Sequence, residues 1–316
     1  MTRAYTVQRG FYRVKTEALA EKIGKIAGIS RISQNEKLSG HTTFQAGGPA
    51  KLFAVPEEPD ALKELLRLLA AEKEPFFILG NGSNVLFRDE GFSGVVISMK
   101  ALNRITVDPD TGILEAEGGA ALSTAAGQAA AASLTGMEFA AGIPGTIGGA
   151  VVMNAGAYGG EMKHIVEEVT LLNEETGEIM KKTGAEMQFG YRESLLKREP
   201  AVVLRVRLRL QAGDPEKIRE TMAELSEKRR EKQPLEYPSA GSTFKRPEGY
   251  FAGKLIEDAG LKGFSVGGAS VSEKHAGFVI NRDHATASEL ITLIHEVQRI
   301  VLEKQGVLLE PEVLIL

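Results

Sequence analysis

The spacing of apolar residues along the chain predicts both helices and strands. Leucines recur every three or four residues over 60–73, which indicates an amphipathic helix. Apolar residues alternate with arginines over 202–210, which indicates a strand with one solvated face. Short apolar runs at 76–79 and 95–99 predict buried strands, and the turn at 108–112 between two apolar runs predicts a hairpin.

The second half of the chain continues this mixed pattern. The segment 211–215 is typical of a domain boundary because it combines glycine, aspartate and proline. Thr286 and Glu289 form a capping box, which predicts that a helix begins there. The other expected elements are helices over 123–133, 215–232 and 250–259, and strands over 169–172, 178–181, 277–281 and 312–316.

Composition restricts the class of protein. The chain has 316 residues, which suggests roughly two domains. It has no cysteine, so disulfides, thiolate metal sites and cysteine nucleophiles are excluded. The formal net charge of -4 predicts no nucleic-acid partner. The first thirty residues contain no apolar core of a signal peptide and no membrane span, so we expect a cytoplasmic protein without a membrane partner.

The strand predicted at 76–79 runs into a glycine-rich loop. The loop consists of Gly80, Asn81, Gly82, Ser83 and Asn84. Its consecutive backbone N–H groups can face one anion, and its small polar side chains can add donors. The loop is not a dinucleotide-binding fingerprint, because Val85 stands where the third glycine is expected. It is not a P-loop either, because no Gly-Lys-Ser/Thr sequence follows. It is either a phosphate-binding nest or an ordinary turn.

A second glycine-rich run follows and extends as far as residue 159. Its first part consists of Gly142, Ile143, Pro144, Gly145, Thr146, Ile147, Gly148 and Gly149. So much glycine predicts neither a stable helix nor a central strand. A backbone this bare lies against a flat or phosphorylated ligand, or it allows tight packing between subdomains. The length of the run favours the ligand.

Three further segments carry single residues that suit chemistry. Arg192 is a permanently charged donor for an oxyanion or a carboxylate. Ser242 is followed by two cations, Lys245 and Arg246, and this combination suits a nucleotide sugar. Glu312 is a carboxylate at the start of the final predicted strand. Taken alone, the first two segments are better explained by a surface ion pair and by a polar loop, and the alternative for the third is a solvated chain end.

In this order and spacing, the segments resemble the UDP-N-acetylenolpyruvoylglucosamine reductase family. The resemblance covers nearly the whole chain, from about Leu38 to Leu316. Each segment is weak evidence alone, and all of them in register are specific. The segments are Thr43–Gly48, Gly80–Asn84, Gly142–Gly149, Asn154–Gly159, Phe189–Ser194, Ala240–Lys245 and Glu310–Val313.

The resemblance implies an α+β fold. It consists of an FAD-binding domain of the vanillyl-alcohol-oxidase or PCMH type, with two α+β lobes, and a C-terminal α+β substrate-binding domain. We expect an N-terminal helical extension over 1–37, the FAD-binding domain over 38–211 and the substrate domain over 212–316, whose final strand returns to the active site. Gly80–Asn84 and Gly142–Gly149 would hold FAD non-covalently with their backbone.

The same resemblance implies an NADPH-dependent flavoprotein oxidoreductase of peptidoglycan precursor synthesis. In the family, NADPH reduces FAD, the flavin N5 gives a hydride to C3 of UDP-N-acetylglucosamine enolpyruvate, and a proton arrives at C2. The catalytic residues fall on Ser242 as proton donor, Arg192 and Glu312, and substrate contacts fall on Tyr191, Arg192, Lys245 and Arg246. We expect a small nucleotide-sugar substrate, no metal and no obligate protein partner.

Some members of the family carry a long insertion between the arginine and serine motifs. A tyrosine in that insertion closes over the substrate. The span from Arg192 to Ser242 is short here, so the resemblance indicates the shorter subtype without this tyrosine lid.

Two other functions remain as alternatives from the sequence. A flavin oxidase of the same fold would often attach FAD covalently through His or Cys. The chain has no cysteine, and none of its five histidines lies in a glycine-rich motif. A non-catalytic regulator that binds flavin or a nucleotide sugar would have no need of Ser242, Arg192 and Glu312 together.

Overall fold

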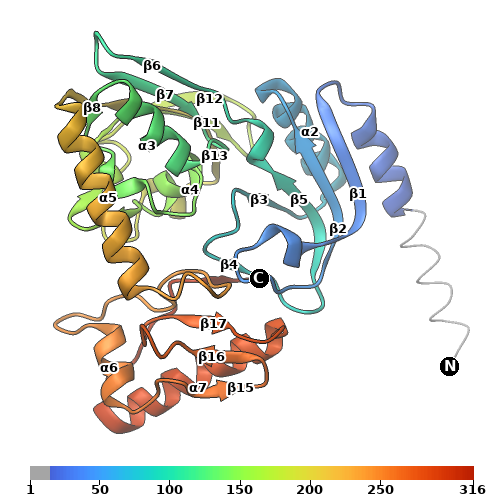
Figure 1. Ribbon diagram of the computed structural model, residues 1–316. Coiled ribbons are helices and arrows are strands. Elements are labelled where there is room, and N and C mark those ends of the chain that lie inside the picture. The colour runs from blue at the N-terminus through green and yellow to red at the C-terminus, as the bar shows by residue number, and fades with distance from the viewer. Residues whose placement is uncertain (1–14) are drawn as a thin grey trace, which may run out of the picture.

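The computed structural model describes residues 15–316, which form three regions (Figure 1). The blue segments form a first lobe, the green and yellow segments form a second lobe, and the red segments form a third region below them. Helices and strands mix in all three regions, as the predicted α+β class requires. Within residues 15–316, no helix combines the length and the apolar character needed to cross a membrane.

The first lobe is built on a four-stranded sheet. Its strand order is β1 (Ile29–Lys37), β2 (Pro49–Pro56), β5 (Phe92–Ser98) and β3 (Phe76–Leu79). The last three strands are parallel, and β1 is antiparallel to β2. Helix α2 (Pro59–Glu72) connects β2 to β3 and buries the leucines whose spacing predicted it. Two 3-10 helices, η1 (Leu38–His41) and η2 (Met99–Ala101), complete the lobe.

The N-terminal segment differs in part from the expected helical extension over 1–37. Residues 15–24 are helical, residues 29–37 form β1 instead, and residues 1–14 lie outside the described part of the chain. Ile29 and Ile32 of β1 pack against the core of the first lobe. The first sheet therefore begins before the predicted domain boundary at residue 38. Apolar residues do not alternate along β1, so the sequence pattern gave no signal for a strand.

The second lobe is built on a five-stranded antiparallel sheet. Its order is β12 (Ile179–Thr183), β11 (Val166–Asn173), β13 (Ala201–Arg209), β7 (Ile113–Glu117) and β6 (Ile105–Asp108). The predicted hairpin β6–β7 is confirmed, and the strands expected over 169–172 and 178–181 pair as β11 and β12. The core joins one face of this sheet to two helices, α3 (Leu122–Ala131) and α4 (Ile147–Val152). The smaller elements are β9 (Gly156–Ala157), β10 (Gly160–Glu161), η4 (Met162–His164) and η5 (Leu195–Lys197).

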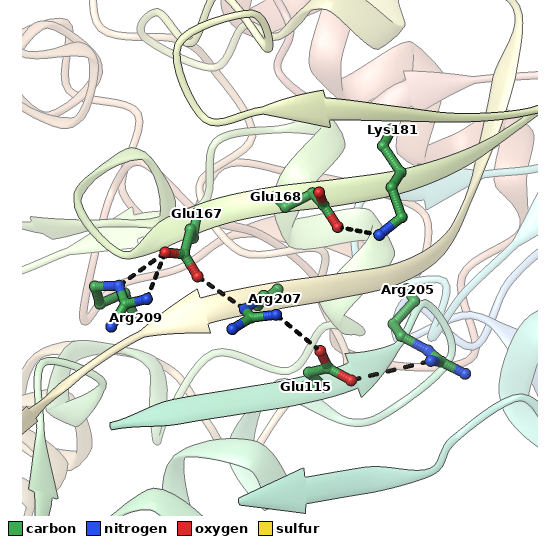
Figure 2. A network of polar contacts seen from close by, with 7 residues as sticks. All are labelled: Glu115, Glu167, Glu168, Lys181, Arg205, Arg207 and Arg209. Atoms are coloured by element: carbon green, nitrogen blue, oxygen red, sulfur yellow. Dashed lines mark hydrogen bonds and ion pairs between the residues drawn. The ribbon is translucent and has the colours of Figure 1, made fainter. Parts of the chain in front are cut away.

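Part of the other face of this sheet is exposed and charged (Figure 2), and the rest of it packs against the first lobe. Glu167 accepts from Arg207 Nε at 2.9 Å and from Arg209 Nη2 at 2.6 Å. Arg205 and Arg207 also approach Glu115, at 4.0 and 3.7 Å. The alternation predicted for 202–210 is confirmed only from Arg205 onward. An irregularity in the register of β13 with β11 places Val202 and Leu204 in the core of the first lobe instead. Exposed ion pairs contribute only about 0–1 kcal/mol each, so burial on the opposite face is what orients β13.

Helix α5 (Pro215–Lys232) has the predicted bounds and packs on the second lobe. It contacts α3, η3 (Glu138–Ala140) and β8 (Leu134–Thr135), and β14 (Gln211–Ala212) pairs with β8. Asp214 caps the helix by accepting from the N–H of Glu216 at 2.8 Å. Residues 211–232, which we expected in the substrate domain, therefore lie against the second lobe instead.

The third region contains a small sheet and a long helix. The sheet order is β15 (Ser265–Val266), β16 (Ala269–Val271) and β17 (Val279–Asn281). Helix α6 (Ala252–Asp258) and helix α7 (Ala287–Gln305) pack beside it. The capping box predicted at Thr286 and Glu289 is confirmed.

The third region is attached to the first lobe at several points. The final strand β18 (Leu314–Ile315) pairs in parallel with β4 (Val85–Leu86). Phe44 of the first lobe is fully buried in the core of the third region, and its carbonyl accepts from Asn281 Nδ2 at 2.9 Å. Asp89 accepts from the N–H groups of Ala287 and Ser288, at 2.8 and 2.9 Å. These contacts fix the third region beside the first glycine-rich loop.

Candidate active site

The first glycine-rich loop, Gly80–Asn84, lies between β3 and β4. Within the described residues, the backbone N–H groups of Asn81, Gly82, Ser83 and Asn84 donate to no acceptor. Gly82 has a φ of +65°, and a Cβ there would lie 2.2 Å from the His41 carbonyl oxygen, so only glycine fits. Four consecutive free N–H groups form the kind of nest that binds phosphate.

The second glycine-rich run faces this loop. Asn81 Nδ2 donates to the Pro144 carbonyl at 2.9 Å, and a Cβ on Gly80 would lie 2.5 Å from Thr146 Oγ1. The two glycine-rich segments that we expected to hold FAD are thus in direct contact. Backbone N–H groups in the second run are partly used by the protein, for example from Gly148 to the Gly118 carbonyl at 2.8 Å.

The second run also contains a helix that the sequence did not predict. The density of glycine argued against a stable helix, and the structure corrects this with α4. Thr146 caps the helix, since its hydroxyl accepts from the Gly149 N–H at 3.3 Å. The helix is short, and its residues Ile147, Ala150 and Val151 are buried in the core of the second lobe. Tertiary packing therefore outweighs the low helix propensity of glycine.

The two loops fit a dinucleotide cofactor such as FAD. The free N–H groups of the first loop suit a pyrophosphate, and the lack of side chains at Gly80 and Gly82 lets the backbone come close. The residues Gly80–Asn84 would hold the pyrophosphate, and Gly142–Gly149 would form the adjoining wall.

Arg229 of α5 is a candidate ligand contact that no sequence motif predicts. Its Cδ lies 3.0 Å from where a Cβ on Gly142 would be. Among the described residues, no carboxylate pairs with this guanidinium, and burial lowers its pKa. The sequence offered no signal because Arg229 lies in a helix with many charged residues. An unpaired, partly buried cation beside the second run suits an anionic group.

Arg192 lies in a tight turn closed by hydrogen bonds between Gly190 and Glu193. Its φ of +55° is in the left-handed region, which is uncommon for a residue other than glycine. Its Nε donates to Glu312 Oε1 at 2.6 Å, and its guanidinium lies 5.3 Å from the centre of the Tyr191 ring. The turn therefore directs the guanidinium toward the C-terminal carboxylate at the cost of backbone strain.

Glu312 is held from three sides. Its N–H donates to the Thr243 carbonyl at 2.8 Å, and its own carbonyl accepts from Asn84 Nδ2 at 3.1 Å. Glu312 therefore connects the loop that carries Ser242 and the first glycine-rich loop through its backbone, and Arg192 through its carboxylate. Burial raises the pKa of the Glu312 carboxyl, and the positive charge of Arg192 opposes that rise.

Ser242, Arg192 and Glu312 line one cavity of about 420 Å³. Ser242 is exposed, and its hydroxyl makes no hydrogen bond to another residue in the range 15–316. The structure thus brings together three residues from segments that are far apart in the sequence. The hydroxyl is free to meet a ligand that Arg192 and Glu312 contact.

Two of the other predicted substrate contacts also line this cavity, and one does not. Tyr191 and Arg246 are lining residues, and the Arg246 N–H donates to the Tyr191 hydroxyl at 3.1 Å. Lys245 is not a lining residue, and its ammonium pairs with Glu310. Several other lining residues belong to no recognisable sequence motif and were not predicted, namely Phe251, Lys254, Lys262, Lys274 and His275.

Comparison with known proteins places this geometry in a family. A family model described as the C-terminal domain of UDP-N-acetylenolpyruvoylglucosamine reductase matches residues 233–316, and one described as an FAD binding domain matches residues 50–183. The reductase of Caldanaerobacter subterraneus is 52% identical over 94% of this chain and 97% of its own length. The reductase of Clostridium botulinum strain Eklund 17B is 46% identical over 91% and 93%.

A solved structure supports the same relationship. The crystal structure of UDP-N-acetylenolpyruvylglucosamine reductase from Thermus caldophilus superimposes with a TM-score of 0.77 at 36% identity. The match covers 91% of this chain and 98% of that chain. The PCMH-type fold and FAD as cofactor, both expected from the sequence, are confirmed. Of the three functions considered from the sequence, the comparisons favour the reductase over a covalent flavin oxidase and over a non-catalytic regulator. The chain belongs to the UDP-N-acetylenolpyruvoylglucosamine reductase family and is a flavin-dependent oxidoreductase.

Proposed function

We propose that the protein reduces UDP-N-acetylglucosamine enolpyruvate to UDP-N-acetylmuramate with electrons from NADPH, in the cytoplasmic synthesis of peptidoglycan precursors. Membership of the reductase family supports the reaction. The observation that carries the residue assignment is the cavity lined by Ser242, Arg192 and Glu312. Such a combination has no purpose in a protein that only binds a nucleotide sugar.

Bound FAD would supply the hydride that adds to C3 of the enolpyruvyl group, after it has taken a hydride from NADPH. The protein must then stabilise negative charge at C2 and on the adjoining carboxylate, and it must deliver one proton to C2. Both tasks fall to side chains of the cavity.

Arg192 is suited to the substrate carboxylate. Its Nε is used by Glu312, and its two terminal nitrogens make no hydrogen bond within residues 15–316. The free edge of the guanidinium therefore matches two carboxylate oxygens and the charge that develops on them. Glu312 holds that edge in place. Since burial raises the pKa of Glu312, the carboxyl can also carry a proton and polarise the same oxygens.

Ser242 is suited to proton delivery at C2. Its hydroxyl faces the cavity without a protein partner, so it is available to the substrate. A serine is a weak acid in water, but a carbanionic C2 is a far stronger base than water, so the transfer is favourable. A neutral donor also adds no competing charge beside the reacting group. The proton passes from Ser242 Oγ to C2, and the serine is reprotonated from solvent.

The domain roles follow from the same assignment. We propose that the two lobes hold FAD and that the C-terminal region, from about residue 233, holds the nucleotide sugar. Ser242 and Glu312 come from that region, whereas Arg192 comes from the second lobe. The reacting end of the substrate would therefore lie where the regions meet.

The test is an anaerobic half-reaction. NADPH should bleach the yellow protein, and UDP-N-acetylglucosamine enolpyruvate should restore the colour. If the flavin stays reduced after that addition, the proposed function is wrong.

Replacing Ser242 with alanine separates the two halves of the reaction. We expect Ser242→Ala to be bleached by NADPH at the normal rate and reoxidised by the substrate roughly 100- to 10,000-fold more slowly. The matched control is Ser239→Ala, because Ser239 lies in the same loop and does not line the cavity. Loss of bleaching in Ser242→Ala would instead place the serine at the flavin or the nicotinamide.

A further inference from the structure

Phe251 is an exposed aromatic ring in the wall of the candidate active site. It is 62% exposed, and it lines the same cavity as Ser242. The guanidinium of Arg246 lies over this ring, with Cζ 3.9 Å from the ring centre. A stack this close, at a position open to water, is a cation–π contact that presents a flat, charged surface to the cavity.

Arg246 is fixed in this position before any ligand binds. Its backbone N–H donates to the Tyr191 hydroxyl at 3.1 Å, and its Nε donates to the Tyr250 carbonyl at 3.2 Å. Its two terminal nitrogens make no hydrogen bond to the described residues. A guanidinium held by its stem and by a ring, with its outer edge free, loses little conformational freedom when it binds an anion.

Arg246 is also distinguished by charge. Of the Lys and Arg residues that line the cavity, it is the one without a carboxylate partner among residues 15–316. The pairs formed by the others are Arg192 with Glu312, Lys254 with Asp258, Lys262 with Glu257 and Lys274 with Glu236. Arg246 therefore provides the uncompensated positive charge of the cavity, which a diphosphate would neutralise.

A chain of pairwise contacts connects the reacting groups to Phe251. Glu312 contacts Arg192, and the Arg192 guanidinium lies 5.3 Å from the Tyr191 ring. The Tyr191 hydroxyl contacts Arg246, which stacks on Phe251. A ligand with a carboxylate at one end and a nucleobase at the other would meet these groups in that order.

We propose that Phe251 is a specificity-determining residue that contacts the uracil ring of the substrate and holds Arg246 against its diphosphate. This inference rests on the proposed function, because it takes the reacting end of the substrate to lie at Arg192. The exposed ring and the guanidinium cover the nucleotide from a fixed wall. A separate mobile lid is then unnecessary at this end of the cavity.

The experiment is a calorimetric titration of the FAD-loaded protein with UDP. We expect Phe251→Leu to weaken UDP binding about tenfold, because a leucine keeps apolar volume but loses the aromatic face. Phe251→Tyr keeps the ring and should bind UDP within about twofold of the unaltered protein. The matched control is Tyr250→Leu, since Tyr250 is the adjacent exposed aromatic residue and does not line the cavity.

Arg246→Lys tests the second half of the inference. It keeps the charge and loses the planar fork, so we expect UDP to bind about tenfold more weakly. In the double variant that carries both Arg246→Lys and Phe251→Leu, the fold-loss in UDP affinity should be smaller than the product of the two single fold-losses. The reason is that the ring and the guanidinium act as a unit. In turnover, Phe251→Leu should raise KM for the nucleotide sugar and leave kcat nearly unchanged.

The outcomes distinguish this inference from the function on which it rests. If Phe251→Leu binds UDP as tightly as the unaltered protein, or if Tyr250→Leu weakens binding equally, the role of Phe251 is overturned. If the unaltered protein cannot be reoxidised by UDP-N-acetylglucosamine enolpyruvate, the proposed function fails whatever the UDP titrations give. Retained flavin in each variant confirms that the fold is intact.

Discussion

The contact between the two glycine-rich segments can be tested by replacing Gly80 with alanine. The new Cβ would lie 2.5 Å from Thr146 Oγ1 and 3.3 Å from Thr146 Cγ2. Gly80 does not have a positive φ, so alanine adds no backbone strain and the effect is steric. Thr146 cannot simply turn away, because its hydroxyl caps α4 by accepting from the Gly149 N–H.

The size of the effect follows from these contacts. Overpacking at a rigid contact costs about 1–3 kcal/mol, and losing the Thr146 cap costs about 1 kcal/mol. If the two segments move apart to relieve the contact, the nest formed by Gly80–Asn84 no longer matches its ligand. A loss of about 1–3 kcal/mol in cofactor binding corresponds to a dissociation constant for FAD that is roughly 5- to 150-fold higher.

The assay is FAD release, followed by the fluorescence of free flavin during dilution. The matched control is Gly127→Ala, because Gly127 is an exposed residue of α3 outside both glycine-rich segments and its new Cβ would have no atom within 4 Å. We expect Gly127→Ala to retain FAD. Adding Thr146→Ala to Gly80→Ala should recover part of the affinity, since it removes the obstructing hydroxyl. Equal FAD affinity in Gly80→Ala and Gly127→Ala would refute the steric argument.

Two further changes have defined consequences. Asp89→Ala should lower the free energy of unfolding by about 1–2 kcal/mol at pH 7 in urea titrations. Burial of Asp89 acts to raise its pKa, but hydrogen bonds from Ser288 and Ala287 outweigh burial, so the pKa of Asp89 is lowered. The stabilisation by the Asp89 carboxylate is therefore present above the ordinary Asp pKa. It should be lost as the pH falls through the lowered pKa. Glu312→Gln should remove a pH dependence of substrate reduction. Burial raises the pKa of Glu312, so the rate of flavin reoxidation by the substrate in the unaltered protein should fall as the pH rises through that pKa. In Glu312→Gln, the reoxidation rate measured by stopped flow should not change with pH over that range.

The sequence predicted those elements whose pattern is local. Helix α5 and strand β3 have the predicted bounds, because the prolines that flank α5 and the short apolar run of β3 are local signals. Strand β1 and helix α4 were missed because their partners are distant. β1 is defined by its pairing with β2, and α4 by burial against the sheet of the second lobe. Neither kind of information is present in a short window of sequence.

The same distinction applies to the candidate site. Arg192, Ser242 and Glu312 were found because each lies in a segment that resembles a family motif, and the structure then places all three on one cavity. Phe251 and Arg229 had no motif, and only three-dimensional contacts reveal them. Phe251 is notable because Arg246 stacks on it, and Arg229 because no described carboxylate pairs with it.

Glu312 shows why the site needs every region of the chain. Its carboxylate contacts Arg192 of the second lobe, its carbonyl accepts from Asn84 of the first lobe, and its N–H donates to Thr243 beside the serine. One residue therefore links the phosphate nest, the guanidinium and the proton donor. A shift of the final segment would disturb all three at once, which explains why β18 is paired with β4 and why Asp89 ties α7 to the first lobe. The contacts that attach the third region to the first lobe therefore help to maintain the geometry of the active site.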